Sequence, residues 1–204
     1  MTINEIKQIR NLKTALKDME PYVKNPHFLT QGKRFSNFNM LVREAWANWL
    51  LCVVIGKITK VEHTFRETVD GDGLIVNRNT QVTFPVEHVC AMDFPAGRKL
   101  PTGEDRIIWA IDHKIKRGIE YANGKSLVVF FDGAGLYYRN KIRENILGRH
   151  NFKVVFCVGL LESSEQGYSY SVTEFRDSFE NHSITHRVDI NADFTDWVIS
   201  QVMA

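Results

Sequence analysis

Two acidic residues, Asp72 and Glu87, lie where two short β-prone segments would bring them together. Asp72 belongs to the run Asp-Gly-Asp-Gly-Leu-Ile-Val at 70–76, which a turn-like Asn-Arg-Asn-Thr stretch follows. Glu87 belongs to the next segment, Gln-Val-Thr-Phe-Pro-Val-Glu-His-Val-Cys at 81–90. Two strands joined by a short turn would place both acids at one edge of a sheet. Carboxylate oxygens suit Mg²⁺, and a cation held there can activate water and stabilise a phosphoryl transition state.

Both acids also have simpler explanations that need no metal. The Asp-Gly-Asp-Gly run is ordinary turn chemistry, and on sequence alone the choice between Asp70 and Asp72 stays open. We favour Asp72 because Leu-Ile-Val follows it and places it at the mouth of a strand. Glu87 lies inside an apolar strand, where a charge is costly unless it is paired, bound to metal or on a wet face.

The pattern of apolar residues predicts the elements that must position these acids. Apolar residues at helical spacing indicate amphipathic helices. We expect helices over 3–19, 36–50, 104–121, 138–149 and 194–202. Unbroken apolar runs at 126–131 and 153–161 are typical of strands buried on both faces. Alternating residues indicate edge strands at 168–172 and 184–190, and β-branched residues indicate a strand or an irregular segment at 57–69.

The order of these elements predicts one domain of the α/β (α+β) class, with a mixed central β-sheet flanked by helices. At 204 residues the chain is long enough to bury one substantial core. Within it we expect an N-terminal helical appendage at 1–35, a core at 36–160, and edge strands with a C-terminal helix at 161–204. The candidate acids fall in the middle segment.

Composition argues against several other classes of protein. Hydrophobic residues make up 44% and charged residues 25%, as in globular domains rather than disordered chains. The longest apolar run, 49–55, is too short to span a bilayer, and no signal-peptide region is visible. The three cysteines lie singly in apolar runs without zinc-binding spacing, so we expect reduced thiols and a cytoplasmic protein. A net charge of +2 allows a local nucleic-acid contact but is not the signature of a dedicated DNA-binding domain.

The acids, their order and the elements around them resemble the PD-(D/E)XK, or restriction-endonuclease-like, superfamily. Glu44 lies in Arg-Glu-Ala-Trp on a helix, Asp72 in Asp-Gly-Leu-Ile, and Glu87 in Pro-Val-Glu-His-Val. The segment from Ile-Trp-Ala-Ile-Asp-His-Lys at 108–114 to Leu-Val-Val-Phe at 127–130 is similar to the family's crossover. There, lysines on a helix followed by Tyr lead into an apolar strand. The resemblance covers the middle segment and rests on a few acids and a topology.

The resemblance implies a metal-dependent endonuclease that hydrolyses phosphodiester bonds in nucleic acid, with DNA expected as the substrate. Asp72 and Glu87 would hold Mg²⁺ (or Mn²⁺), and Glu44 would complete the acidic set. One residue departs from the family pattern, because Val89 stands where a lysine is usual, two residues after the Glu. We expect Lys114, at the border of the apolar face of its helix, to supply the missing ammonium.

Each of these further residues again has a simpler explanation. Glu44 lies off the main apolar stripe of its helix, as a solvated carboxylate would. Lys114 fits a side chain that extends along an apolar face to reach water. His88 alternates to the opposite face of the strand from Glu87, which makes it a poor substitute for the lysine. Without a catalytic ammonium, the chain would be a catalytically silent module of this fold that binds a protein or nucleic-acid partner.

Short basic segments are the candidates for contacts with a nucleic-acid backbone. The residues expected to contribute are Arg98, Lys99, Lys116 and Arg117, with the segments 33–34 and 139–143 in support. Such contacts weaken with salt and do not read sequence. Each segment taken alone is better explained as solvated surface. We expect no membrane partner, and a homodimer is one assembly that the sequence leaves open.

Overall fold

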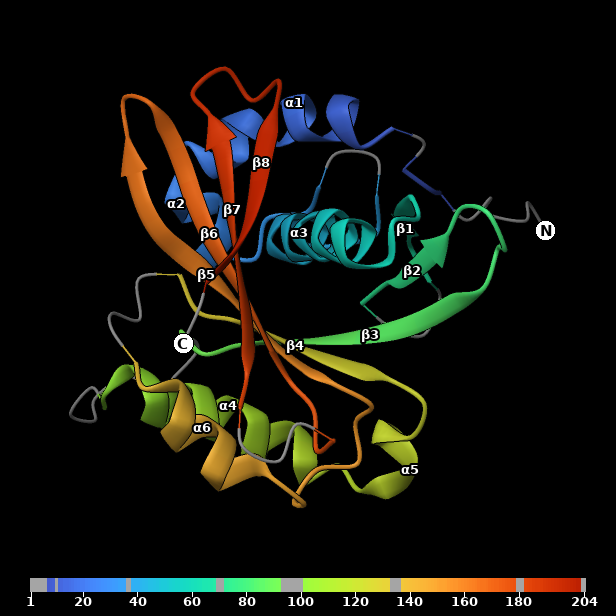
Figure 1. The fold of residues 1–204 in the computed structure, drawn as a ribbon, viewed down its shortest axis with the longest axis vertical. Helices are drawn as coiled ribbons and strands as arrows, with labels where there is room; N and C mark the ends of the chain where they lie inside the picture. The colour runs from blue at the N-terminus through green and yellow to red at the C-terminus, as the bar shows by residue number, and fades with distance from the viewer. Residues whose placement is uncertain are drawn as a thin grey trace.

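A mixed, curled sheet with helices on both of its faces forms the framework of the protein (Figure 1). The computed structural model describes residues 7–9, 11–35, 38–68, 72–92, 101–132, 137–178 and 182–202. Its helices are α1 (Leu12–Val23), α2 (Pro26–Thr30), α3 (Val42–Thr59), α4 (Gly103–Ile115), α5 (Ile119–Ala122) and α6 (Arg139–Ile146). Its strands are β1 (His63–Arg66), β2 (Leu74–Asn77), β3 (Thr83–Cys90), β4 (Ser126–Phe130), β5 (Val155–Ser164), β6 (Gly167–Phe175), β7 (Ile184–Asn191) and β8 (Trp197–Val202).

The strands follow one another across the sheet in chain order, from β1 to β8. The pairs β3–β4 and β4–β5 are parallel, and the remaining pairs are antiparallel. A parallel pair needs a crossover connection, and here α4 with α5, and then α6, lie between the parallel strands in the chain. Every residue of β4 is buried, as its unbroken apolar run predicts. The prediction of a mixed sheet flanked by helices is therefore confirmed.

Each face of the sheet has its own hydrophobic core. On the face covered by α1, α2 and α3, Trp46 stacks on Trp49 with ring centroids 5.2 Å apart, and both indoles are fully buried. On the opposite face, α4 contributes Ile107 and Ile111, and α6 contributes Ile142. Figure 1 shows these two groups of helices on either side of β3, β4 and β5. Strands buried between two helical layers explain why their sequences are apolar without alternation.

Strand β3 changes partners along its length. Thr83–Pro85 pair with β2, whereas Val86–Cys90 pair with β4 on the other side. Antiparallel pairing of β2 with β3 also confirms the expected arrangement of two strands joined by a short turn. The side chain of Asn77 closes that turn by accepting hydrogen bonds from the backbone N–H groups of Asn79 and Thr80. Beyond Pro85, the edge of β3 that faces β2 has no strand partner among the described residues. The candidate site lies at this edge.

The C-terminal segment is a strand, which corrects the helix expected over 194–202. Strand β8 pairs with β7 and places Trp197 and Ile199 toward the core, while Val198 is 67% exposed. Apolar residues two positions apart fit a strand as well as a short helix, and pairing with β7 decides between them. A turn held by the side chain of Asn191, which accepts from the N–H groups of Thr195 and Asp196, leads into β8.

Two further expectations about the ends of the chain need correction. Strands β6 and β7 are interior strands, because β5 and β8 flank them, and β6 is buried along almost its whole length. The described part of 1–35 is also no appendage. Leu16 and Met19 of α1 are fully buried in the same core as α3, and the indole N–H of Trp49 donates to the carbonyl of Leu12 at 2.9 Å. No described helix is both long enough and apolar enough to cross a bilayer.

Two isoleucines test this assignment of the core. Ile111→Ala removes a fully buried side chain from α4 and should lower the free energy of unfolding by roughly 2–5 kcal/mol, because it leaves a cavity. Ile119→Ala changes a side chain that is 67% exposed and should cost less than about 0.5 kcal/mol. Urea denaturation of both variants measures the difference, and equal costs would contradict the assignment of α4 to the core.

Candidate active site

Glu87 is buried in β3 and meets two lysines and a tyrosine. Its Oε1 lies 2.7 Å from Nζ of Lys125, and its Oε2 lies 3.3 Å from Nζ of Lys114. The hydroxyl of Tyr121 also donates to Oε2. Burial would raise the pKa of Glu87, but the hydrogen bonds from Lys125 and Tyr121 and the charge of Lys114 outweigh it and lower that pKa. Glu87 is therefore ionised, and its neighbours balance its negative charge. These contacts offset the free-energy cost of placing a charge in an apolar strand.

A break between α4 and α5 brings Lys114 and Tyr121 to the same carboxylate. We expected one helix over 104–121, but α4 ends at Ile115, and Gly118 has a φ of +94°, which favours glycine. The chain turns there, so the hydroxyl of Tyr121 accepts from Nζ of Lys114 at 2.9 Å. Burial and the hydrogen bond to Glu87 raise the pKa of Tyr121, which keeps the phenol protonated as a donor.

Asp72 lies at the edge of β3 that β2 leaves open. Its Oδ2 accepts from the backbone N–H of His88 at 2.6 Å, and the adjacent carbonyl of Gly73 accepts from the N–H of Val86 at 3.0 Å. The carboxylate therefore touches the residue that follows Glu87. Burial raises the pKa of Asp72 and the negative charge of Glu87 adds to this effect, while the hydrogen bond from His88 opposes it.

A buried pair, Asn48 and His88, fixes the backbone of Asp72 from the α3 side. Oδ1 of Asn48 lies 3.0 Å from Nε2 of His88, and Nδ2 of Asn48 lies 3.4 Å from the carbonyl oxygen of Asp72. Burial and the nearby charges of Lys114 and Arg43 lower the pKa of His88 to about 3, so its ring is neutral. Because the amide N–H of Asn48 faces a carbonyl, its oxygen must accept the Nε2 proton of His88.

Gly73 lets Asn48 approach the acidic segment. A Cβ at this position would lie 2.6 Å from Nδ2 of Asn48, and the φ of +148° is one that other residues rarely adopt. The turn glycine next to Asp72 is thus required by a close contact with α3. The contact also explains why the acid keeps its place at the edge of β3.

Glu44 joins the acidic group from the first turn of α3. Its Oε2 accepts from the backbone N–H of Leu41 at 2.8 Å, as in a helix cap, and it lies one turn before Asn48 on the same side of the helix. Burial and the negative charge of Asp72 together raise the pKa of Glu44 to about 7, against the hydrogen bond from Leu41 and the charges of Arg43 and Lys114. The carboxyl is therefore partly protonated near neutral pH, unlike a solvated one.

The structure thus brings together Glu44, Asp72, Glu87 and Lys114, whose charges act on one another. Of the basic residues expected nearby, exposed Arg117 donates to the hydroxyl of Tyr121 at 3.4 Å, and exposed Lys116 caps the C-terminus of α4. Asp70, Arg98 and Lys99 lie outside the described residues. Within the described ranges, no three His, Cys, Asp or Glu side chains form a group that could hold a metal ion.

Two residues of the site, Lys125 and Asn48, were missed on sequence alone, and His88 was considered only as a substitute for the lysine. Lys125 directly precedes β4, and the register that pairs Leu127 with Glu87 brings it to the carboxylate. Asn48 and His88 read as parts of an apolar helix and an apolar strand, and their only signal was polarity within those runs. Tyr121 was visible as part of the family-like crossover but had no assigned role.

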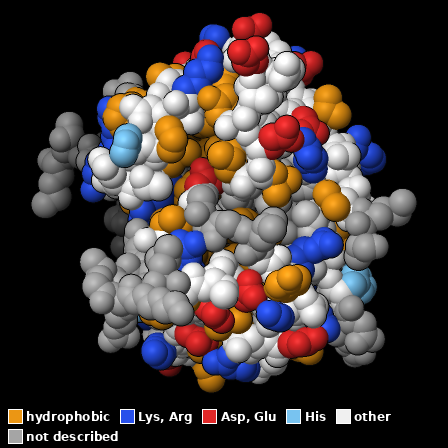
Figure 2. Space-filling view, turned by 90° about the vertical axis from the view of Figure 1, so that its left-hand side faces the viewer, with side chains coloured by type: hydrophobic (Ala, Val, Ile, Leu, Met, Phe, Trp, Pro, Cys, Tyr) orange, Lys and Arg blue, Asp and Glu red, His pale blue; other side chains and the backbone are white. Residues whose placement is uncertain are grey.

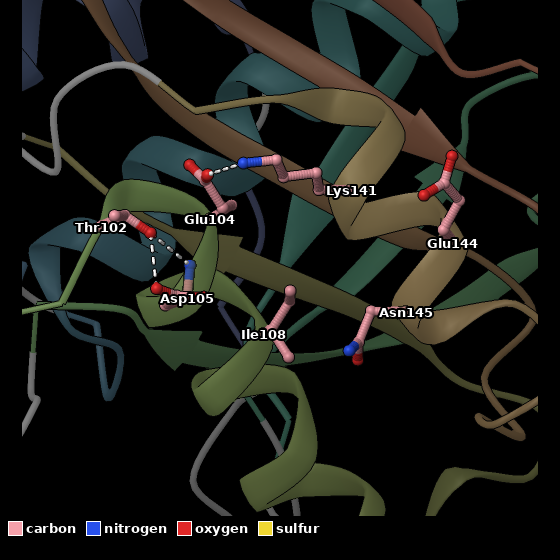
Figure 3. A pocket seen from close by; sticks show the side chains of 7 residues that line it. All are labelled: Thr102, Glu104, Asp105, Ile108, Lys141, Glu144 and Asn145. Atoms are coloured by element: carbon pink, nitrogen blue, oxygen red, sulfur yellow. Dashed lines mark hydrogen bonds and ion pairs between the residues drawn. The ribbon is translucent and has the colours of Figure 1, made fainter.

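A separate cavity of about 470 Å³ lies between α4 and α6, away from Glu87 (Figure 3). Its acids have local partners, since Nζ of Lys141 lies 3.0 Å from Oε1 of Glu104 and Thr102 caps α4 through Asp105. These bonds stabilise the start of α4 and its contact with α6, and the cavity has none of the residues of the candidate site.

Comparisons of the chain with protein-family models, with curated proteins and with solved structures each give no match. Function must therefore be inferred from the contacts of the residues described above.

Replacing Asn48 tests the buried link between α3, β3 and Asp72. Asn48→Leu keeps the number and branching of the heavy atoms but leaves the Nε2–H of His88 and the carbonyl of Asp72 unpaired, so stability should fall by at least about 1–3 kcal/mol. Asn79→Leu, at an exposed turn position, should cost less than about 0.5 kcal/mol. Urea denaturation measures both, and similar small losses would show that the Asn48 contacts contribute little.

The pKa of Glu44 predicts a pH dependence of stability. Between its ordinary value of 4.5 and the folded value of about 7, the folded protein keeps a proton that the unfolded chain has lost. Glu44 therefore makes the wild type less stable as pH rises through this interval. Glu44→Gln keeps an acceptor for Leu41 and removes the titration, so its stability relative to wild type should increase from pH 5 to pH 8 in urea denaturation. Glu120→Gln, at an exposed position of α5, should show no such trend.

Proposed function

We propose that this protein is a metal-dependent nuclease that hydrolyses phosphodiester bonds in nucleic acid, with DNA as the expected substrate. The observation that carries the proposal is the meeting of Asp72, Glu87, Glu44 and Lys114 at the open edge of β3. Two acids from neighbouring strands, one from the preceding helix and an ammonium from the following helix match the set that the resemblance implies. The missing lysine of β3 is replaced by a lysine of α4.

The acidic residues fit a divalent cation by their chemistry. Burial raises the pKa of both Glu44 and Asp72, so their ionised forms lack enough nearby positive charge, which a cation would supply. Glu87 accepts from three donors and, with about four acceptor positions on a carboxylate, retains room for one more partner. Asp72 and Glu87 would hold Mg²⁺ (or Mn²⁺), with Glu44 beside them. Two protein carboxylates are enough for Mg²⁺, because the bound ion keeps several water ligands.

The cation, when bound, would activate water and neutralise charge on the phosphoryl group. Lys114 has the other electrostatic role. Its ammonium is fixed between Glu87 and Tyr121, and its charge acts on Asp72 and Glu44, so it can offset negative charge that develops on the phosphate oxygens. Glu44, with a pKa of about 7, can take up a proton near neutral pH.

A second candidate function is a catalytically silent binding module of the same fold. The specific observation in its favour is that Glu87 is already neutralised by Lys114, Lys125 and Tyr121 without a cation. Val89, which packs against the core on the side of α4, leaves β3 itself without an ammonium. Such a module would bind its partner without turnover and without Mg²⁺.

Cleavage assays separate the two functions. Wild-type protein with Mg²⁺ should cleave at least one of single-stranded DNA, double-stranded DNA and RNA. Asp72→Asn, Glu87→Gln and Lys114→Met should each reduce the rate by roughly 100-fold or more, because each removes a group that acts on the phosphate or on the cation. Lys57→Met, which removes an equal charge from the exposed last turn of α3, is the matched control and should keep most of the activity.

Two outcomes would contradict the nuclease assignment. Cleavage that survives both Asp72→Asn and Glu87→Gln would show that another site, or a contaminant, is responsible. Absence of cleavage together with no calorimetric signal for Mg²⁺ or Mn²⁺ would favour the silent module.

A further inference from the structure

A second cavity, of about 420 Å³, lies where the N-terminus of α6 meets the start of β7. Its volume is within the range of small-ligand pockets. Its described lining includes Tyr137, Tyr138, Arg139, Arg143 and His182, and none of its described lining residues is acidic. It has no residue in common with the Glu87 cluster, and it falls on the basic segment 139–143 that the sequence pointed to.

The cationic character of this cavity is local. On the same helix, Lys141 faces the other cavity, where Glu104 neutralises it at 3.0 Å and Glu144 also lies (Figure 3). Arg139 and Arg143 thus line this cavity and Lys141 lines the other, although Nζ of Lys141 also lies 4.6 Å from the ring centroid of Tyr138. Figure 2 shows acidic and basic side chains interspersed over one face of the molecule, rather than one continuous basic field.

Arg139 is positioned by uncharged groups. Its Nη1 donates to Oγ1 of Thr185 at 2.8 Å, Thr185 lies 3.0 Å from Oγ1 of Thr173, and the hydroxyl of Tyr137 lies 3.3 Å from the same Oγ1 of Thr173. No described acid forms an ion pair with Arg139. Arg139 is half-buried and is fixed in place by these contacts, and no described residue neutralises its charge. Its guanidinium has five N–H donors in a planar fork.

We infer that this cavity binds a phosphate group of a nucleic-acid strand, so that it is a second contact for the substrate of the proposed nuclease. Arginine forks match phosphate oxygens better than other cations do. The backbone N–H of Tyr138 at the start of α6 already donates to the carboxylate of Glu104, so the arginine side chains and not the helix N-terminus would supply the donors. Tyr138 is 64% exposed; Nζ of Lys141 lies 4.6 Å from the centroid of its ring, and the exposed part of the ring offers a surface on which a base can stack.

Binding of a fluorescein-labelled single-stranded DNA 12-mer, measured by anisotropy in EDTA, tests this inference without cleavage. Arg139→Gln and Tyr138→Ala should each weaken binding about 5- to 10-fold. For Arg139→Gln, the slope of the logarithm of the binding constant against the logarithm of the salt concentration should also become shallower by roughly 0.7. That is the value for one phosphate contact on a single strand. Arg149→Gln is the matched control, because Arg149 pairs with Asp112 outside the cavity, and it should change binding less than about 2-fold.

Competition by inorganic phosphate gives a second measurement. Phosphate should displace the 12-mer from wild type and from Arg149→Gln at similar concentrations, and less effectively from Arg139→Gln. Equal losses in Arg139→Gln and Arg149→Gln, or unchanged binding in both Arg139→Gln and Tyr138→Ala, would overturn the inference. The inference rests on the proposed function only for the identity of the ligand, so different results would refute the phosphate site and the nuclease activity. DNA binding through Arg139 without cleavage refutes the nuclease alone, and cleavage with intact binding by Arg139→Gln refutes the phosphate site alone.

Discussion

The change of partner along β3 is the constraint on which the candidate site depends. Pairing with β2 stops at Pro85 and pairing with β4 begins at Val86, so one edge of β3 loses its strand partner where the strand becomes buried. A backbone N–H at such an edge must find an acceptor. The carboxylate of Asp72 provides one for His88 at 2.6 Å. This single hydrogen bond both completes the edge and holds an acid beside Glu87.

Burial has opposite effects on the acids because their neighbours differ. Glu87 receives hydrogen bonds from two lysines and a tyrosine, so its pKa falls although it is buried. Among the described residues, the carboxylates of Asp72 and Glu44 each receive only a backbone N–H, so burial prevails and their pKa values rise. One side of the site is therefore neutralised by lysines, whereas on the other side burial favours the protonated carboxyls. The proposed cation would lie on that second side.

Local patterns predicted the buried strands, the β2–β3 pair and most helices, because apolar periodicity reports burial. They also singled out Asp72 and Glu87, and the family resemblance pointed to Lys114, which the structure places 3.3 Å from Glu87. They could not give Lys125 or Asn48, whose contacts with residues 87 and 88 span 38 and 40 positions and depend on register and helix placement. The C-terminal strand was missed for a related reason, since a short apolar segment takes its conformation from the strand beside it.

The ammonium beside Glu87 comes from Lys114 of α4 and not from β3, which has a structural consequence for both the nuclease and the silent binding module. Val89 is on the same face of β3 as Glu87 and is half-buried against the core beneath α4, so β3 itself presents no ammonium on that face. Lys114 reaches Glu87 from α4 instead, and the turn at Gly118 brings Tyr121 to support it. The position of the ammonium therefore depends on the packing of α4 and α5 and not on β3 alone. A shift of these helices would change the charge at the acids without disturbing the sheet, which makes the α4–α5 turn the most sensitive support of the site.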